Sequence, residues 1–254
     1  MQYNSTMPKA QAAAPPTDLL RGASLFLDFD GTLVELADRP DAVSVSDRLK
    51  RVLAALDKTL DGRLAIISGR GAGDIHAMIG GQAYTVVGSH GMEFHFAGGR
   101  TIVAPRPIAL DAVQHEAERL ALQWPGVIVE HKPLGIALHY RLSPVAERAC
   151  KQLAAELAAE HGLHLQTGKM MVELRAAGGD KGSAIRSLLE QEPTMRGTRP
   201  VFIGDDDTDE PGFVTVEEMG GAGILVGTRQ GSAARYRLSG VAEVVDWLEA
   251  ACRT

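Results

Sequence analysis

The chain has 254 residues, of which 45% are hydrophobic and 23% charged, and its formal net charge is -6. These values are typical of a globular protein long enough for one large domain or for a domain that carries an insertion. The acidic balance and the lack of a basic stripe argue against nucleic acid as a partner. No apolar run approaches the roughly 20 residues that span a bilayer, so we expect no membrane association.

The N-terminal segment, residues 1–22, is rich in Ala, Pro, Gln and Ser. It lacks the basic start and long apolar core of a signal peptide, and we expect a flexible tail there. Two cysteines, Cys150 and Cys252, lie far apart and match no metal-ligand spacing. Free thiols in a reducing, cytoplasmic setting are therefore expected. The sequence carries no clear sign of oligomeric state, and a monomer is the working expectation.

Five short apolar runs end abruptly in small or polar residues, as strands buried on both faces of a parallel sheet do. Helical stripes lie between them, and Ser46 is placed to cap the first of these helices. Alternating strands and helices predict an α/β fold with a doubly wound parallel sheet, whose ligands bind at the carboxyl ends of the strands. The five runs cover residues 24–27, 64–67, 84–87, 201–203 and 223–226, and the helical stripes cover 46–60, 184–189 and 241–248.

The stretch from about 105 to 176 has a different order of elements, helix–strand–strand–helix–strand–strand. This order predicts an inserted α+β cap domain over 105–176, within a discontinuous core formed by 23–104 and 177–254. Hinges near 104–106 and 176–179 would let the cap close on the core. The predicted cap helices cover 107–123 and 144–161, and the strands cover 127–132, 136–141, 164–166 and 170–175, with a hairpin turn at 133–135.

Asp28 and Asp30 lie two residues apart at the end of the first strand, so their side chains start on the same side. Two buried carboxylates repel unless a cation or a phosphate site accompanies them; an acidic turn is the structural alternative for the pair alone. Asp28 is placed to attack phosphorus, and Asp30 to protonate the leaving oxygen and then deprotonate water. Because both reactants are anionic, such attack needs Mg²⁺.

Further polar groups follow later strands. Five acids occupy six positions from Asp205 to Glu210, which is more than a helix N-terminus explains, and oxygen ligands of this kind suit Mg²⁺. Ser68 offers a hydroxyl to a phosphate oxygen, with Arg70 beside it, although a Ser-Gly turn explains Ser68 equally well. Lys181 opens a helix against the helix dipole, so neutralising a phosphoryl group is one reason for its presence and a plain surface position is the other.

The ordered set of Asp28-Phe29-Asp30-Gly31-Thr32, Ser68, Lys181 and the acidic run resembles the haloacid dehalogenase superfamily of phosphohydrolases. The resemblance implies an aspartyl-phosphate at Asp28, general acid/base work by Asp30 and phosphate contacts from Ser68 and Lys181. It also implies Mg²⁺ held by Asp28, the backbone carbonyl of Asp30 and Asp205, with Asp206 or Asp209 close by.

Polar residues at alternate positions in the predicted cap strands indicate one polar sheet face. They are Glu130 and Lys132, His139 and Arg141, and Lys169 and Glu173. A solvated outer face is the structural alternative, but a face beside a phosphate site suits hydrogen bonding to sugar hydroxyls.

The core also carries Ser89, His90 and Glu93 in a Gly-Ser-His-Gly-Met-Glu run. Together with the cap residues, this run resembles the trehalose-6-phosphate phosphatase family, which implies hydrolysis of that small-molecule sugar phosphate as the last step of trehalose biosynthesis. The alternatives are a phosphatase for another sugar phosphate, of the sucrose 6-phosphate or mannosylglycerate phosphate type, a non-catalytic sugar-phosphate sensor, and a phosphotransferase or mutase. By that resemblance Glu93, Glu130, Lys132, Arg141, Lys169 and Glu173 would contact the sugar. Arg70, Ser89, His90 and His139 are further candidate substrate-binding residues.

Overall fold

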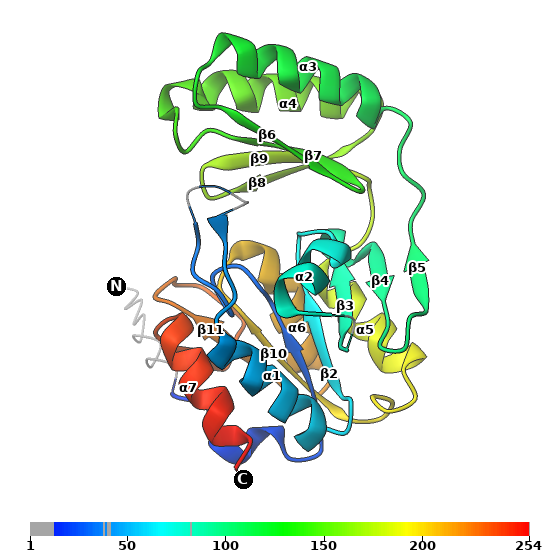
Figure 1. Cartoon of the computed structure of the whole chain (residues 1–254), viewed down its shortest axis with the longest axis vertical. Helices are drawn as coiled ribbons and strands as arrows, with labels where there is room; N and C mark the ends of the chain where they lie inside the picture. Colours follow the sequence, from blue (N-terminus) through cyan, green and yellow to red (C-terminus); the bar gives the residue numbers. More distant parts are fainter. Residues whose placement is uncertain (1–12, 38, 40–41, 82, 254) are drawn as a thin grey trace, which may run out of the picture.

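The computed structural model describes residues 13–37, 39, 42–81 and 83–253. These residues form two sheets, one of eight strands and one of four, stacked along the long axis of the molecule (Figure 1). Helices cover both faces of the larger sheet and one face of the smaller, which confirms the predicted α/β class.

The eight-stranded sheet has the order β12-β11-β10-β1-β2-β3-β4-β5, with β1 at its centre. Six strands are parallel, and only the pairs β3–β4 and β4–β5 are antiparallel. The chain runs outward in one direction from β1 and in the other from β10, and such a reversal opens a crevice at the carboxyl ends of the strands. The strands are β1 (Ala23–Leu27), β2 (Leu64–Ile67), β3 (Thr85–Gly88), β4 (Glu93–His95), β5 (Thr101–Val103), β10 (Arg199–Gly204), β11 (Ala222–Val226) and β12 (Tyr236–Leu238).

Alternate residues of the central strands enter two separate hydrophobic cores. Leu25 and Leu27 of β1 face one core, which is covered by α1 (Asp47–Thr59), α2 (Ala72–Ile79) and α7 (Val241–Ala251). Phe26 of β1 faces the other core, covered by α5 (Lys181–Gln191) and α6 (Glu210–Glu218). Ser46 caps α1 through a hydrogen bond from the backbone N–H of Leu49, as its sequence position predicts.

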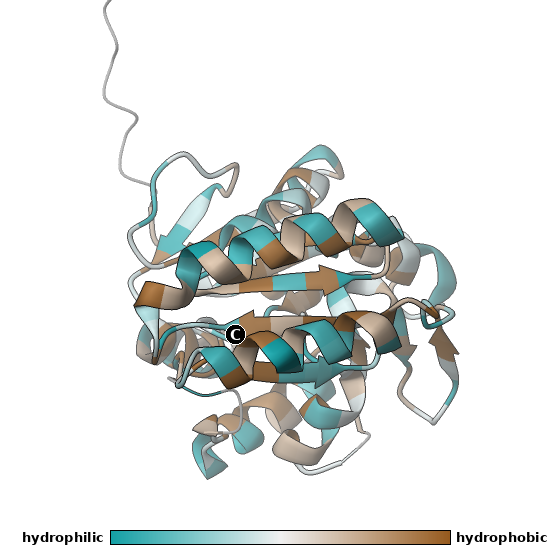
Figure 2. Ribbon diagram, turned by 90° about the horizontal axis from the view of Figure 1, so that it is seen from above, coloured by the Kyte–Doolittle hydropathy of each residue, from teal (hydrophilic) through white to brown (hydrophobic). Residues whose placement is uncertain are grey.

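The smaller sheet has the order β6-β7-β9-β8 and is antiparallel throughout. Its two helices, α3 and α4, pack on the face away from the eight-stranded sheet, and Figure 2 shows them side by side in the view from above. The other face of this sheet looks toward the core (Figure 1). The elements are α3 (Leu110–Gln123), β6 (Ile128–Lys132), β7 (Gly135–His139), α4 (Glu147–His161), β8 (His164–Gly168) and β9 (Met171–Arg175).

The N-terminal segment differs from its prediction where the structure describes it. Residues 1–12 lie outside the described residues. Residues 17–20 form a 3-10 helix, and Leu19 and Leu20 are buried in the core that α7 covers. The indole N–H of Trp247 donates to the carbonyl of Pro15 at 2.9 Å. The prediction of a flexible tail is therefore wrong for residues 13–22, because two adjacent leucines have an apolar site to fill.

Short elements were not predicted. The strands β4, β5 and β12 each have three residues, too few to show an alternating pattern. Cys150 and Cys252 are free thiols, as expected. Within the described ranges, no helix combines the length and the apolar character needed to cross a membrane.

Candidate active site

Three neighbouring strands of the core deliver polar side chains to one edge of the sheet. Asp28 follows β1, Ser68 follows β2 and Asp205 follows β10. The backbones of Asp28 and Ser68 continue the sheet hydrogen bonding, since their N–H groups donate to the carbonyls of Ile203 and Val87 at 2.9 Å each. All three side chains line a cavity between the core and the smaller sheet. The carboxyl-end position expected from the sequence is the one observed.

The turn after β1 packs closely against the acidic loop, residues 205–210 after β10. Gly31 has φ +82°, and a Cβ there would lie 2.3 Å from an Oδ of Asp205. A glycine is therefore required both for the left-handed backbone and for the close approach of the two loops.

Lys181 lies at the first position of α5 and is almost fully buried. Its Nζ donates to Oδ1 of Asp28 and to Oδ1 of Asp209, at 2.5 Å each. Asp180 caps the helix by accepting from the N–H of Ser183, which fixes the direction in which α5 presents its first turn. Lys181, predicted as a phosphate contact, thus bridges two buried carboxylates.

Asp209 organises the acidic loop. Its Oδ2 accepts from the backbone N–H groups of Asp205 at 2.8 Å and of Asp206 at 2.9 Å. Each of Asp28, Asp205 and Asp209 has a carboxylate oxygen in a group whose members lie within 4.8 Å of one another. Oxygen atoms in such a cluster are the donor set that Mg²⁺ prefers.

The electrostatics of this cluster favour a cation. Burial raises the pKa of Asp28 well above its ordinary value, and the nearby carboxylates of Asp209 and Asp205 raise it further, against the charge of Lys181. Burial also raises the pKa of Asp205. Ionisation of these clustered carboxylates is therefore costly, so this site suits one further positive charge beside Lys181.

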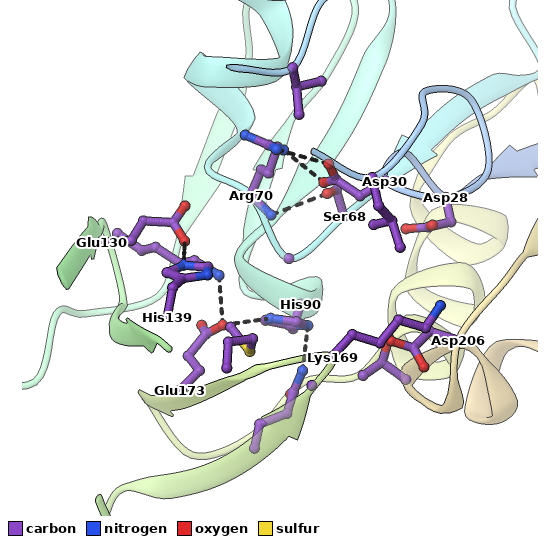
Figure 3. A pocket seen from close by; sticks show the side chains of 18 of the residues that line it. Asp28, Asp30, Ser68, Arg70, His90, Glu130, His139, Lys169, Glu173 and Asp206 are labelled. Atoms are coloured by element: carbon purple, nitrogen blue, oxygen red, sulfur yellow. Dashed lines mark hydrogen bonds and ion pairs between the residues drawn. The ribbon is translucent and has the colours of Figure 1, made fainter. Parts of the chain in front are cut away.

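Asp30 is held by Arg70. The guanidinium binds both carboxylate oxygens, with Nε 2.7 Å from Oδ2 and Nη2 2.8 Å from Oδ1 (Figure 3). The hydroxyl of Ser68 accepts from the backbone N–H of Arg70 at 3.1 Å, which ties the loop after β2 to the same corner of the cavity. Arg70, predicted as a substrate contact, lines the cavity as well as binding Asp30.

The cap sheet presents a polar face to the core. Strand pairing aligns Glu130, Ala137, Glu173 and Gln166 in one row across all four strands. Glu130 accepts from Nε2 of His139 at 2.7 Å. Ala137 lies between Glu130 and Glu173 in this row, and its small side chain leaves space in the cavity between the two carboxylates.

Polar contacts between the cap and the core include two that involve carboxylates. Nε2 of His90 lies 3.4 Å from Oε2 of Glu173, and Nζ of Lys169 donates to Oδ2 of Asp205 at 2.9 Å. His90 holds its position through a left-handed backbone (φ 56°, ψ 37°), and its ring packs where a Cβ of Gly69 would be, 2.4 Å from Cε1. The sugar-binding and phosphate-binding candidates therefore share one cavity.

The structure brings most of the predicted site residues together. Ser89, Glu93 and Asp209 do not line the cavity. Glu93 is buried, and its carboxylate accepts from the N–H of Ala72 at 3.0 Å and from the hydroxyl of Ser89 at 3.2 Å, so it stabilises the start of α2. The predicted residues in the lining are Asp28, Asp30, Ser68, Arg70, His90, Glu130, Lys132, His139, Arg141, Lys169, Glu173, Lys181, Asp205 and Asp206.

Sequence reasoning missed several lining residues. They include Gln166 on β8 and Thr208 in the acidic loop, together with Leu36, Ala37 and Arg39 from the loop after β1. Gln166 pairs with Glu173 on the neighbouring strand, so both side chains lie on the same face of the sheet. The period-two pattern of the strand was the signal that could have identified Gln166.

The Glu173 carboxyl is expected to titrate near pH 2. Burial alone would raise its pKa, but the charge of Lys132, 2.6 Å away, and the hydrogen bond from His90 lower it to about 2. A lowered folded-state pKa adds stability that is present above about pH 4.5 and is lost as the pH falls toward 2. A ¹³C NMR titration of the carboxyl carbon, assigned with Glu173→Gln, measures the midpoint.

Lys132→Met is the matched variant for this titration. With the opposing charge removed, burial should raise the Glu173 pKa above its ordinary value of 4.5. A wild-type midpoint near 4.5, or no response to Lys132→Met, would contradict the assignment of the ion pair.

The fold and the polar edge define the class of protein: the chain has the architecture of the capped phosphatases of the haloacid dehalogenase type. Among solved structures, the C-terminal domain of Candida albicans trehalose-6-phosphate phosphatase superposes with a TM-score of 0.82 at 23% identity, covering 97% of this chain and 99% of that one.

Comparison of sequences identifies a family within this class. Residues 26–242 match the family model described as trehalose-phosphatase. The chain is 38% identical to the trehalose-6-phosphate phosphatase of Escherichia coli K12 over 88% of this chain and 84% of the relative. It is 39% identical to a probable trehalose-phosphate phosphatase of Sinorhizobium fredii over 85% and 81%. The chain belongs to the trehalose-phosphatase family and is a phosphoric monoester hydrolase.

Proposed function

We propose that the chain hydrolyses trehalose 6-phosphate to trehalose and phosphate, with Mg²⁺ and through an aspartyl-phosphate at Asp28. The observation that carries the proposal is the single cavity, lined on the core side by Asp28, Ser68 and Lys181 and on the cap side by charged and hydrogen-bonding groups. The names of the two relatives in Escherichia coli and Sinorhizobium fredii support the choice of substrate.

The core residues would divide the chemistry between them. Asp28 attacks the phosphorus atom, while Lys181 and the hydroxyl of Ser68 bind phosphoryl oxygens. Asp30 protonates the leaving sugar oxygen and then takes a proton from the attacking water. Because Arg70 binds both oxygens of Asp30, one of these hydrogen bonds has to open before the carboxyl can reach the sugar oxygen.

The residues present fit a magnesium ion. The carboxylates of Asp28 and Asp205, with the backbone carbonyl of Asp30, would hold it, and Asp206 lines the same cavity. Asp209 already accepts from Lys181 and two backbone N–H groups, so its role is to hold the loop in place. Mg²⁺ would offset the repulsion between the carboxylate and the phosphate dianion.

The cap residues would bind the sugar. Glu130, Lys132, His139, Lys169 and Glu173 offer donors and acceptors at short range on one face. Arg141 lines the cavity just beyond β7. Many hydroxyls in a disaccharide need many such partners, which a phosphate alone does not. A cytoplasmic location and a monomeric state stay predictions from the sequence.

A substrate panel tests the function. Phosphate release from trehalose 6-phosphate in Mg²⁺ is expected to exceed that from sucrose 6-phosphate, a mannosylglycerate phosphate and glucose 6-phosphate by at least tenfold in kcat/KM. Chelation with EDTA should abolish it, and added Mg²⁺ should restore it. The reason for the preference is that unpaired buried polar groups penalise an ill-fitting sugar.

Two results would reject parts of the proposal. Equal or faster turnover of another disaccharide phosphate would reject the substrate, and full activity in EDTA would reject the metal. Binding of trehalose 6-phosphate without phosphate release would favour a sensor.

A further inference from the structure

The orientation of the Gln166 side chain is set at both ends of its amide. Its Oε1 accepts from Nε of Arg175 at 2.9 Å, and its Nε2 lies 3.5 Å from Nδ1 of His90. Arg175 can only donate, so the oxygen end is assigned without ambiguity. The short contact fixes the oxygen, while the long one holds the nitrogen weakly.

The proton on His90 agrees with this orientation. Nε2 of the ring faces the carboxylate of Glu173, which accepts and cannot donate when ionised. Burial lowers the pKa of His90, so the ring is neutral at pH 7 and carries its proton on Nε2. Nδ1 is then an acceptor, and the amide nitrogen of Gln166 donates to it.

The amide nitrogen has a second hydrogen, and Gln166 lines the cavity. Nearby charged groups are largely committed to one another: Lys132 donates to Glu173, and His139 to Glu130. A neutral N–H at this position suits the oxygen of a sugar hydroxyl. Replacing such a donor affects sugar binding without touching the groups at phosphorus.

We propose that Gln166 is a specificity-determining residue that donates a hydrogen bond from Nε2 to a hydroxyl of the sugar substrate. The inference rests on the proposed function in so far as the substrate is a sugar phosphate. The competing explanation is that Gln166 only holds the Arg175 side chain in position. Arg175 also donates to the carbonyls of Ala176 and Gly178, where the chain returns from the cap to the core. A positioning role affects every substrate alike, whereas a sugar contact does not.

Two substitutions separate these roles. Gln166→Glu keeps an acceptor for Arg175 and removes the donor, and Gln166→Met removes both without adding charge. The measured quantity is the ratio of kcat/KM for the best sugar phosphate of the panel to that for p-nitrophenyl phosphate, which has no sugar. We expect both variants to lower this ratio by about three- to tenfold, mainly through KM, as the loss of one neutral hydrogen bond implies. Titration calorimetry with the dephosphorylated sugar should show weaker binding too.

Gln152→Glu on the outer helix α4 is the control, because this exposed side chain donates to Glu156 of the same helix, away from the cavity. An unchanged ratio in both variants overturns the assignment, and so does an equal loss on both substrates. If trehalose 6-phosphate is not the best substrate, the proposed substrate fails, yet the ratio still tests Gln166 with the sugar phosphate that is.

Discussion

Asp28→Asn is expected to abolish phosphate release while the protein stays folded. The amide cannot attack phosphorus, and removal of a covalent nucleophile lowers kcat by a factor on the order of 10⁴ or more. Folding should not suffer, because burial makes the ionised form of Asp28 costly even beside Lys181, as the raised pKa of Asp28 indicates. Steady-state phosphate release and thermal unfolding of the same preparation measure the two effects.

The two readouts keep activity apart from stability. The unfolding midpoint of Asp28→Asn should equal or exceed that of the wild type, because Lys181 retains Asp209 as a partner. Residual activity above about 1% of the wild type would show that another group attacks phosphorus. A large fall in the unfolding midpoint would instead give the Asp28–Lys181 pair a net structural role.

Lys181→Met is expected to damage both activity and stability. The side chain is buried and donates to two carboxylates, and its loss leaves Asp28 and Asp209 facing each other without a counter-charge. Breaking a buried ion pair from one side costs about 3–5 kcal/mol of unfolding free energy. The rate should fall at least about 10²-fold, since a charge aimed at the phosphoryl group is gone. Urea unfolding and phosphate release measure these changes.

Lys151→Met is the matched control, because Lys151 makes an exposed ion pair with Glu147 on the outside of the cap. No measurable change in stability or rate is expected there. Addition of Mg²⁺ should restore part of the stability lost in Lys181→Met, since under the proposed function the cation would bind Asp28, one of the two carboxylates that Lys181 contacts. Wild-type stability in Lys181→Met would contradict the buried network.

The core of the site was predictable because strand ends determine where side chains meet. Three apolar runs are followed directly by Asp28, Ser68 and Asp205. In a parallel sheet the carboxyl ends of the strands share one edge, so these three side chains have to lie there. The polar cap face was predictable from its period of two. Both inferences need only the geometry of the strand backbone and the alternation of side chains along a strand. These follow from short stretches of sequence.

Side-chain partners were not predictable in the same way. Arg70 binds Asp30, and Glu93 accepts from the N–H of Ala72; neither partner was predicted from the sequence. Each partner comes from a distant part of the chain, and local pattern carries no information on which of several cavity groups a long side chain selects. Gln166 was missed because a neutral amide gives no charge signal.

The central pairing of β1 with β10 has a consequence for how the enzyme is made. Ala23 pairs with Arg199, whereas the whole four-stranded sheet with α3 and α4 lies within one continuous stretch of chain between them. On the ribosome, the cap can therefore form from local contacts before the strand that carries Asp205 has been synthesised. Until then one edge of β1 has no strand partner, and Asp28 lacks the acidic loop that carries Asp205 and Asp209. The active site is therefore completed only after the cap can already have formed.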